Sequence, residues 1–577
     1  MSRRANKKPI PARELSRKRK DADADNRGRS DMEAADELSP IVTAYDRQIS
    51  KDLNENLEIL KNLFGSDDIV YREFTIGTAN ELPALMIFID ELTDKNSMQR
   101  DGMTNLMLWA KSVLSPAVST ADGINRLISG NLLALAELKE LTTYPEIVEA
   151  VLGADAVLLV HGLDLALDWG VKSWEHRGVG DATNENTIRG PREAFNEVMK
   201  TSLALIRRRI KDPMLRVKFS QLGKRSVTDV AVLYIEGLAN PALVEEVKRR
   251  MELIDTEAIA DGSYVEQFIQ DAPYSPFPQV QWTERPDRAT AGLLEGRVVI
   301  VCDGSPNAII APATMPNFLP APEDYYDRFL LSTFIRFVRT VSIFSSVLLP
   351  ALYISVINFH HELLPTTLAI AIAGSRTGVP FSAVMEALVM EFTFELLREA
   401  GLRLPSALGS TIGIVGGIII GQAAVSAGLV SPIMVVIVAL TAIGSFAIPS
   451  YNMAATLRFL RFPLLLLAGA FGLYGVTAGG IVILLHLATL KSFGVPYLSP
   501  LAPLTLSGLT DTVVRAPLWQ MRYRPLFLRP GDTRRSSKRP SYYQNRKRMH
   551  PDGLEMAPLS HPKPQKEGKQ DDDTAHH

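Results

Sequence analysis

The sequence has 577 residues, more than one domain usually needs, with 46% hydrophobic residues and a formal net charge of −2. Its single cysteine, Cys302, excludes an intrachain disulfide. The average composition is that of an ordinary soluble protein, but it hides two different parts, because residues 1–330 are rich in charge whereas residues 340–510 are nearly free of it.

The first 45 residues are polar, rich first in Lys and Arg and then in Asp and Glu, without apolar periodicity. Such a segment buries too little apolar surface to fold, so we predict a disordered charged extension over 1–45. We interpret its basic start as a solvated tail rather than a site for anionic lipid or nucleic acid, and we predict no nucleic-acid partner. No apolar signal-peptide core follows it, which predicts a cytoplasmic N-terminal half.

Segments with strand and helix character alternate between residues 46 and 322. LPALMIFI (82–89) is rich in branched and aromatic residues and predicts a strand. PREAFNEVMKTSLALIRRRI (191–210) predicts an amphipathic helix with proline in its first turn. ADAVLLVHGLDLALDWG (154–170) predicts two strands, and GRVVIVCDGSPNAIIAP (296–312) predicts a hairpin.

This alternation predicts an α/β or α+β cytosolic domain. We expect two α/β lobes, 46–174 and 175–322, because the polar run EHRGVGDATNENTIRG (175–190) interrupts the pattern. The next segment, 323–339, predicts an amphipathic juxtamembrane helix that carries arginines and runs into a first apolar span at about 340–359.

The apolar part predicts an α-helical polytopic membrane domain over 340–510. No Asp, Glu, Lys or Arg occurs from Leu404 to Leu457, and this stretch is long enough for two spans, since one span needs about 20 apolar residues. We place Arg458 and Arg461 in the cytoplasmic loop that follows, because such loops collect Lys and Arg.

Two regions leave the number of spans open. One more crossing is required between 363 and 402, and 463–490 is either a broken helix pair or a single span followed by an uncharged segment that dips back into the membrane. Because the segment 511–577 is basic, we predict a disordered cytoplasmic tail and therefore an even number of crossings, four to six.

Three carboxylates stand out at the start of the membrane domain: Glu386, Glu391 and Glu395. Glu391 and Glu395 share a helix face with Arg398. Ionisable groups at membrane depth are costly and usually functional, so these three are candidates for an ion path. In the alternative interpretation the helix lies at the membrane surface, with its charges in headgroup water.

Four glycines recur at four-residue intervals in GSTIGIVGGIIIGQ: Gly409, Gly413, Gly417 and Gly421. Glycine lowers helix propensity by roughly 1 kcal/mol relative to alanine, so an apolar helix needs a reason to contain four. Small residues let helix backbones approach closely in lipid. We predict a helix-packing stripe, either within the chain, between subunits or beside a pore.

The sequence contains no P-loop, no GxSxG elbow, no zinc-ligand spacing and no kinase motif, so we expect neither an enzyme nor a cofactor. His360, His361 and Glu362 are adjacent and would point in different directions on a helix, which favours a polar loop over a metal site.

Six stretches, in this order, are similar to the A subunits of GerA-type spore germination receptors over about residues 50–515. They are RGPREAFNE (189–197), VAVLYIEGLAN (230–240), VCDGSPNAIIAP (301–312), PEDYYDRF (322–329), EALVMEFTFELLREAGLRLP (386–405) and GSTIGIVGGIIIGQAAVSAGLVSP (409–432).

The resemblance implies a multi-pass protein of the spore inner membrane that works with a transporter-like B subunit and a lipoprotein C subunit. It also implies self-association into a nutrient-gated cation channel. The family has a stand-alone SpoVAF-like branch, which the sequence does not separate from the nutrient receptors. A secondary transporter and a structural scaffold for receptor clustering are the competing hypotheses.

Overall fold

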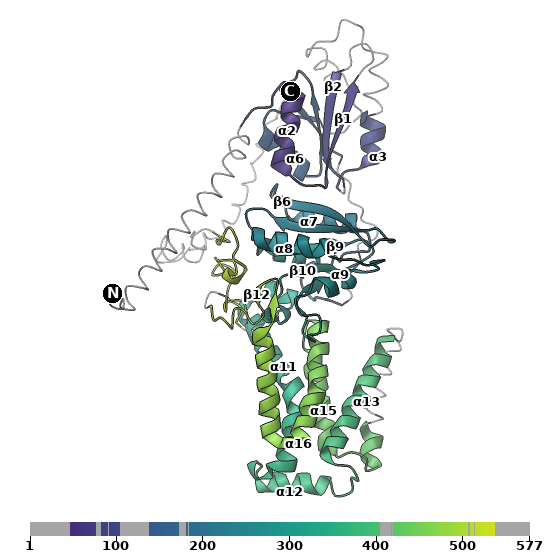
Figure 1. The fold of residues 1–577 in the computed structure, drawn as a ribbon, viewed down its shortest axis with the longest axis vertical. Coiled ribbons are helices and arrows are strands. Elements are labelled where there is room, and N and C mark those ends of the chain that lie inside the picture. Colours follow the sequence, from purple (N-terminus) through teal and green to yellow (C-terminus); the bar gives the residue numbers. More distant parts are fainter. Residues whose placement is uncertain are drawn as a thin grey trace, which may run out of the picture.

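In the computed structural model, three parts follow one another along the molecule: lobe 1 (47–171), lobe 2 (180–322) and a helical region (329–489) (Figure 1). The charged extension 1–45 and the chain beyond 536 lie outside the residues that the structure describes. The described residues are 47–76, 82–90, 92–103, 138–171, 180–182, 184–403, 417, 419, 421–505, 508–512 and 514–536.

Lobe 1 is built on an antiparallel sheet in the order β1-β2-β4-β5-β3. Strand β2 is the predicted LPALMIFI segment, and its lack of alternation follows from burial of both faces. Helices α2 and α6 cover one face, and the π-turn Met98–Met103 borders the other. The elements are α2 Leu53–Phe64, β1 Ile69–Ile76, β2 Leu82–Ile89, α3 Lys95–Ser97, β3 Leu138–Leu141, α6 Tyr144–Leu152, β4 Ala156–Val160 and β5 Ala166–Trp169.

Lobe 2 contains a second antiparallel sheet, in the order β6-β7-β9-β10-β8. The predicted hairpin is present as β9 and β10, and Gly304 in its turn has φ +78°, which suits glycine. Its elements are α7 Met199–Arg209, β6 Leu215–Leu222, β7 Thr228–Ile235, α8 Pro241–Glu252, α9 Gly262–Ile269, β8 Gln281–Thr283, α10 Pro286–Leu294, β9 Val298–Cys302 and β10 Ala308–Ala311.

The two lobes repeat one topology. We number the five strands of each lobe by their order along the chain. In both sheets, neighbouring strands then follow the order first, second, fourth, fifth, third. A helix precedes the first strand (α2 or α7), and another precedes the fourth (α6 or α10). Both sheets are antiparallel throughout, so the first two parts of the chain are α+β rather than α/β.

A buried ion pair joins the lobes. Arg207 on α7 donates through Nε to Asp68 Oδ2 (2.7 Å) and through Nη2 to Asp68 Oδ1 (2.8 Å) and Ser66 Oγ (2.9 Å). The side chains of Arg207 and Asp68 are 1% and 0% exposed. Ser66 Oγ also accepts from the backbone N–H of Val217 on β6 (2.8 Å). The turn between α2 and β1 is therefore fixed on lobe 2.

Two predicted helices begin later than expected. The helix predicted over 191–210 starts at Met199, because the backbone of Ala194 and Phe195 donates to Gly180 and Glu284 instead of continuing a helical turn. The helix predicted from 323 starts with a 3₁₀ turn, Pro322–Tyr325, before α11 begins at Phe329.

The helical region comprises α11 Phe329–Phe359, α12 Thr366–Ser375, α13 Ala383–Arg403, α15 Pro432–Phe446 and α16 Tyr451–Thr489, with a 3₁₀ turn at His361–Leu363. By length and composition, two of the described helices, α11 and α16, could cross a membrane. Helix α11 leads away from lobe 2 and α12 lies at the far end of the molecule (Figure 1).

Helix α16 is a hairpin of two arms. Gly472 has φ 61° and ψ −141°, far from helical values. A Cβ placed on Gly479 would lie 2.7 Å from Leu464 Cδ2, although 15 residues of straight helix would separate the two positions by about 22 Å. Thr456 near one end and His486 near the other both hydrogen-bond to adjacent residues of lobe 2. Of the two alternatives for 463–490, the structure has the broken helix pair.

After α16 the chain returns to lobe 2. The short strands β11 Lys491–Ser492 and β12 Val495–Pro496 pair with each other. Ser492 Oγ donates to Gln279 O (2.6 Å), and Tyr497 Oη donates to Pro278 O (2.7 Å). Residues 491–497 thus lie on lobe 2 rather than in a membrane segment that extends to 510.

The described part of the tail predicted to be disordered, up to residue 536, is folded against lobe 2. In the segment 514–536, Arg524 Nε donates to Leu294 O (2.9 Å) and Gly531 N donates to Leu238 O (3.0 Å), both in lobe 2. This segment includes a 3₁₀ turn at Leu526–Leu528. Disorder from residue 511 is therefore wrong for the described part of the tail.

Candidate functional site

The carboxylates predicted for an ion path lie on α13, inside the helical region. Glu386 and Glu391 are 1% and 2% exposed, and the side chain of Glu395 is about one-third exposed. The alternative that these charges lie in headgroup water therefore fails for the first two, because protein encloses them. A buried carboxylate requires a partner, and each of the three has an arginine.

Glu386 holds three helices together. Its Oε1 accepts from Arg376 Nη2 (3.0 Å) and Nε (3.2 Å), just after α12. Its Oε2 accepts from the backbone N–H of Ser431 (3.0 Å), the residue that caps the N-terminus of α15. A carboxylate at this position satisfies a free N–H and interacts favourably with the helix dipole. These contacts give Glu386 a structural role.

Glu391 pairs with Arg461 of α16, and Arg461 Nε also donates to Ser346 O of α11 (2.8 Å). One turn further along α13, Glu395 pairs with Arg398 and lies 3.6 Å from Arg458 Nε. Two carboxylates thus face three guanidinium groups where α11, α13 and α16 meet. We call these five residues the charged cluster.

The charged cluster is incompletely hydrogen-bonded. Among the described residues, Glu391 Oε1, Arg398 Nε, Arg458 Nη2 and Arg461 Nη2 are buried without a hydrogen-bond partner. An unsatisfied buried polar group costs about 1–3 kcal/mol, so this arrangement needs a compensating reason. An unsatisfied buried group calls for an explanation, and ionisable residues in apolar helices are usually functional.

The sequence placed Arg458 and Arg461 in a cytoplasmic loop, and this prediction is wrong. Both lie in the first arm of α16, and both are buried. Their spacing of three residues puts them on one helix face, as the spacing of four does for Glu391 and Glu395. One apolar helix carries two acidic residues on one face, and another carries two arginines on one face. This pattern in the sequence could have predicted the charged cluster.

The glycine stripe is only partly within the described residues, since Gly409 and Gly413 lie outside them. A Cβ on Gly417 would meet nothing within 4 Å, and one on Gly421 would meet only Val435 Cγ1 at 3.5 Å. Neither glycine is required by packing against the described residues of its own chain. A contact with another subunit or with a pore stays a prediction for this stripe.

The close helix packing lies instead in the α16 hairpin. A Cβ on Gly475 would collide with the carbonyl oxygen of Leu467 in the opposite arm, and one on Gly469 would collide with Val384 of α13. The spacing of three between Gly469, Gly472 and Gly475 is a signal in the sequence that could have predicted this packing.

A second ion-pair network joins α11 to the segment that leads into it from lobe 2 and to Asp511. Asp324 accepts from Arg336 Nε (3.0 Å) and Arg339 Nη1 (2.9 Å). Arg336 Nη1 also donates to Asp511 (2.9 Å), which accepts from Tyr325 Oη (2.8 Å). Burial raises the pKa of the Asp511 carboxyl, and the Arg336 guanidinium opposes this rise. We call this network the junction.

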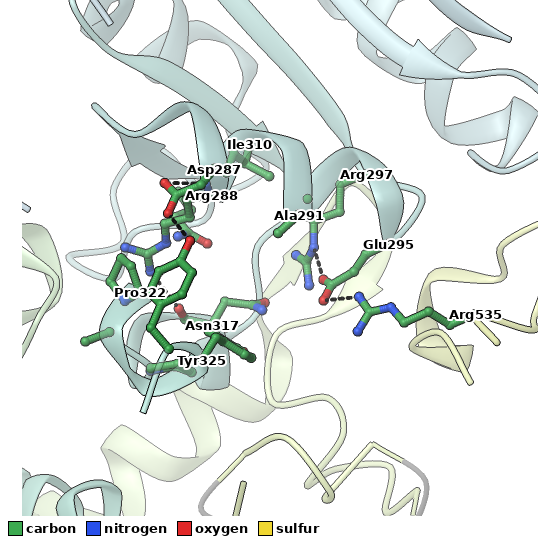
Figure 2. A pocket seen from close by; sticks show the side chains of 15 residues that line it. Asp287, Arg288, Ala291, Glu295, Arg297, Ile310, Asn317, Pro322, Tyr325 and Arg535 are labelled. Carbon is green, nitrogen blue, oxygen red and sulfur yellow. Dashed lines mark hydrogen bonds and ion pairs between the residues drawn. The ribbon is translucent and has the colours of Figure 1, made fainter. Parts of the chain in front are cut away.

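A cavity of about 270 Å³ lies beside the junction. Its walls come from α10, β8 and β10 of lobe 2, from the segment 317–326 that leads to α11, and from Arg535 of the tail. Figure 2 shows Arg297 and Arg535 on either side of Glu295, with Asp287 and Arg288 across the cavity. The distances are 3.1 Å from Arg297 Nε and 3.4 Å from Arg535 Nη2 to the Glu295 carboxylate.

Known proteins match most of the chain. The family described as Bacillus/Clostridium GerA spore germination protein matches residues 57–527. Spore germination protein KA of Bacillus subtilis (strain 168) is 39% identical over 85% of this chain and 89% of its own length. Spore germination protein GerLA of Bacillus cereus is 40% identical over 82% of this chain and 95% of its own length.

Two further matches concern the membrane and the N-terminal part. The uncharacterized membrane protein YfkQ of Bacillus subtilis (strain 168) is 39% identical over 86% of this chain and 94% of its own length. The crystal structure of the N-terminal domain of the A subunit of the Bacillus megaterium spore germinant receptor GerK3 is 30% identical, with a TM-score of 0.37. The match covers 47% of this chain and 98% of the chain in that crystal structure.

Proposed function

The chain belongs to the GerA spore germination family, and we propose that it is the membrane A subunit of a nutrient-responsive germinant receptor that oligomerises into a gated channel for monovalent cations. In this proposal it works with a transporter-like B subunit and a lipoprotein C subunit in the spore inner membrane. Family membership carries the receptor part of the proposal, and the charged cluster carries the channel part.

The proposed membrane arrangement is multi-pass, with both lobes in the cytoplasm. Near the start of α11, Arg339 donates to Leu319 O of lobe 2, and near the end of the second arm of α16, His486 hydrogen-bonds Ser275 of lobe 2. In this proposal the helical region lies in the bilayer, both of its ends are on the cytoplasmic side, and the chain therefore crosses an even number of times; we propose four to six crossings. The hairpin at Gly472 supports this count because it turns one long apolar helix into two arms.

The charged cluster supports conduction through the helical region. Five ionisable side chains are costly in apolar helices that face lipid. Intramembrane ionisable residues usually mark ion or proton pathways. Since Glu391 is paired with Arg461, the structure corresponds to a non-conducting arrangement in this proposal. Separation of the pair would expose carboxylate oxygens to a passing cation. Glu386 is held by Arg376 and Ser431, which supports a position beside the path rather than in it.

The test measures potassium efflux from liposomes that contain the purified receptor, with wild type, Glu391→Gln, Arg461→Gln and the double variant. Each single variant leaves one buried charge without its partner and is expected to be unstable. The double variant removes both charges, so the fold is expected to persist. If Glu391 belongs to the ion path, the double variant assembles but conducts less potassium; normal efflux would make the pair purely structural.

The same liposomes separate the competing hypotheses. A scaffold that only clusters other receptor subunits gives no efflux with wild type at any nutrient concentration. A secondary transporter gives efflux that depends on a gradient of a second substrate. A channel gives efflux that depends only on the gradient of the permeant ion and on nutrient.

A further inference from the structure

The cavity beside the junction has the properties of a small-ligand site. Its volume of about 270 Å³ is large enough for several waters or for a small organic molecule. Ligand sites are typically concave, with a few charged groups on a largely apolar wall. Here the apolar wall includes Ala291, Ile310 and three residues of the lead-in to α11, Pro320, Ala321 and Pro322.

The charges around the cavity are unbalanced. Arg285 holds Asp287 through two hydrogen bonds (3.0 and 2.8 Å), and Glu185 is the ion-pair partner of Arg288. Among the described residues, Glu295 is then the one carboxylate for both Arg297 and Arg535. Four guanidinium groups therefore stand against three carboxylates, which leaves one positive charge over.

The surplus guanidinium donors belong to Arg297 and Arg535. Arg297 is buried, and it uses Nε for Glu295 and Nη1 for the carbonyl oxygen of Pro312. Among the described residues, its Nη2 makes no hydrogen bond. Arg535 is 32% exposed and touches Glu295 through one nitrogen at 3.4 Å, a weak contact. Both side chains line the cavity, so both have donors to offer a ligand.

We propose that this cavity binds a small anion that carries a carboxylate or phosphate group, held by Arg297 and Arg535. Planar guanidinium groups match the oxygen pairs of carboxylate and phosphate. Arg535 exchanges its weak contact with Glu295 for the ligand oxygens. This binding step stands apart from channel activity.

The effect of anion binding on the helical region rests on the proposed function. The bound anion touches lobe 2, the lead-in to α11 and the tail at once, because all three line the cavity. Tyr325, which lines the cavity, also donates to Asp511, the partner of Arg336 on α11. The ligand therefore stabilises the junction in its present arrangement, and its loss loosens the start of α11.

The test is isothermal titration calorimetry on the full chain in detergent micelles, with inorganic phosphate and succinate as separate probes at constant ionic strength. We expect saturable binding of at least one probe. Binding of phosphate alone indicates a phosphate-bearing ligand, and binding of succinate alone indicates an organic acid. Absence of saturable binding of both probes overturns the proposal.

Three variants tie the binding to the cavity. Arg535→Gln is expected to weaken binding about tenfold, the loss typical of one charge-assisted hydrogen bond. Glu295→Gln is expected to strengthen it, because both arginines lose their competing carboxylate, and a damaged fold would not do so. Arg534→Gln, the matched control, removes an exposed arginine one residue away. Equal weakening by Arg534→Gln and Arg535→Gln would mean unspecific attraction to the surface and would refute the site. None of these titrations measures ion flux, so a failed liposome assay leaves their outcome unaffected.

Discussion

The ion pair between the lobes gives the sharpest prediction of stability. Arg207→Met removes the guanidinium and leaves Asp68 buried, with Ser66 Oγ (2.6 Å) as its one remaining side-chain donor among the described residues. Breaking a buried ion pair on one side costs about 3–5 kcal/mol, because the remaining charge is uncompensated. We therefore expect the docking of lobe 1 on lobe 2 to weaken by this amount.

Hydrogen exchange measures the effect directly at the interface. The backbone N–H of Asp67 donates to Val217 O (3.0 Å), and the N–H of Val217 donates to Ser66 Oγ (2.8 Å). Both bonds cross between the lobes, so their amides exchange when the lobes separate. A loss of 3–5 kcal/mol corresponds to a rise in exchange rate of about two to three and a half orders of magnitude.

Arg208→Met is the matched control, because it removes the neighbouring arginine, whose partner Glu193 is one-third exposed. A pair of this kind contributes about 0–1 kcal/mol. The double variant Asp68→Asn/Arg207→Met should recover part of the loss, since no buried charge remains. If Arg207→Met and Arg208→Met raise exchange at Asp67 and Val217 equally, the lobes are held by apolar contacts and the reasoning is refuted.

Three further predictions concern other parts of the chain. Burial raises the pKa of Glu266 to about 7, so its carboxyl favours the folded lobe below pH 4.5, and this contribution is lost as pH rises from 4.5 to 7. Glu266→Gln should therefore raise the thermal stability of lobe 2 at pH 8 and leave it unchanged at pH 4; equal effects at both values would contradict the assignment. Gly475→Ala should prevent formation of the α16 hairpin and lower the yield of folded protein, whereas Gly417→Ala should leave a monomer in detergent as stable as wild type. Equal yields of the two variants would exclude close packing of the arms. Asp324→Asn should lower the melting temperature by several degrees because the buried Arg339 loses its carboxylate partner and the buried Arg336 loses one of its two, and Asp327→Asn, with one exposed ion pair at 3.8 Å, should not. Equal melting temperatures would mean that the junction does not stabilise α11.

The sequence predicted individual helices and strands better than the contacts between them. Periodicity identified β2, the β9–β10 hairpin and the apolar helices, because these patterns depend on residues close together in the chain. It missed the start of α7, since the segment before it bonds to Gly180 and Glu284, which are distant in sequence. It also missed the repeated sheet order, because strand order is a property of non-local pairing.

The candidate site was predicted in part for the same reason. Glu386, Glu391 and Glu395 were recognised as unusual from their apolar surroundings alone. Two of their arginine partners, Arg458 and Arg461, were assigned to a loop, because the rule for cytoplasmic loops treats each charge as unpaired. Only the packing of α13 against α16 shows that Arg461 lies opposite Glu391. The role of a charged residue in an apolar segment therefore depends on its partner on a neighbouring helix.

The return of residues 491–497 to lobe 2 has a consequence for biosynthesis. Gln279 and Pro278 leave the ribosome more than 200 residues before Ser492 and Tyr497, which bind their carbonyl oxygens. All the helices of the helical region are made in between. The hydrogen bonds of Ser492 and Tyr497 to lobe 2 thus form only after those helices have been synthesised and the chain has come back, so a nascent chain that stalls before Lys491 leaves this edge of the lobe open to proteases and chaperones.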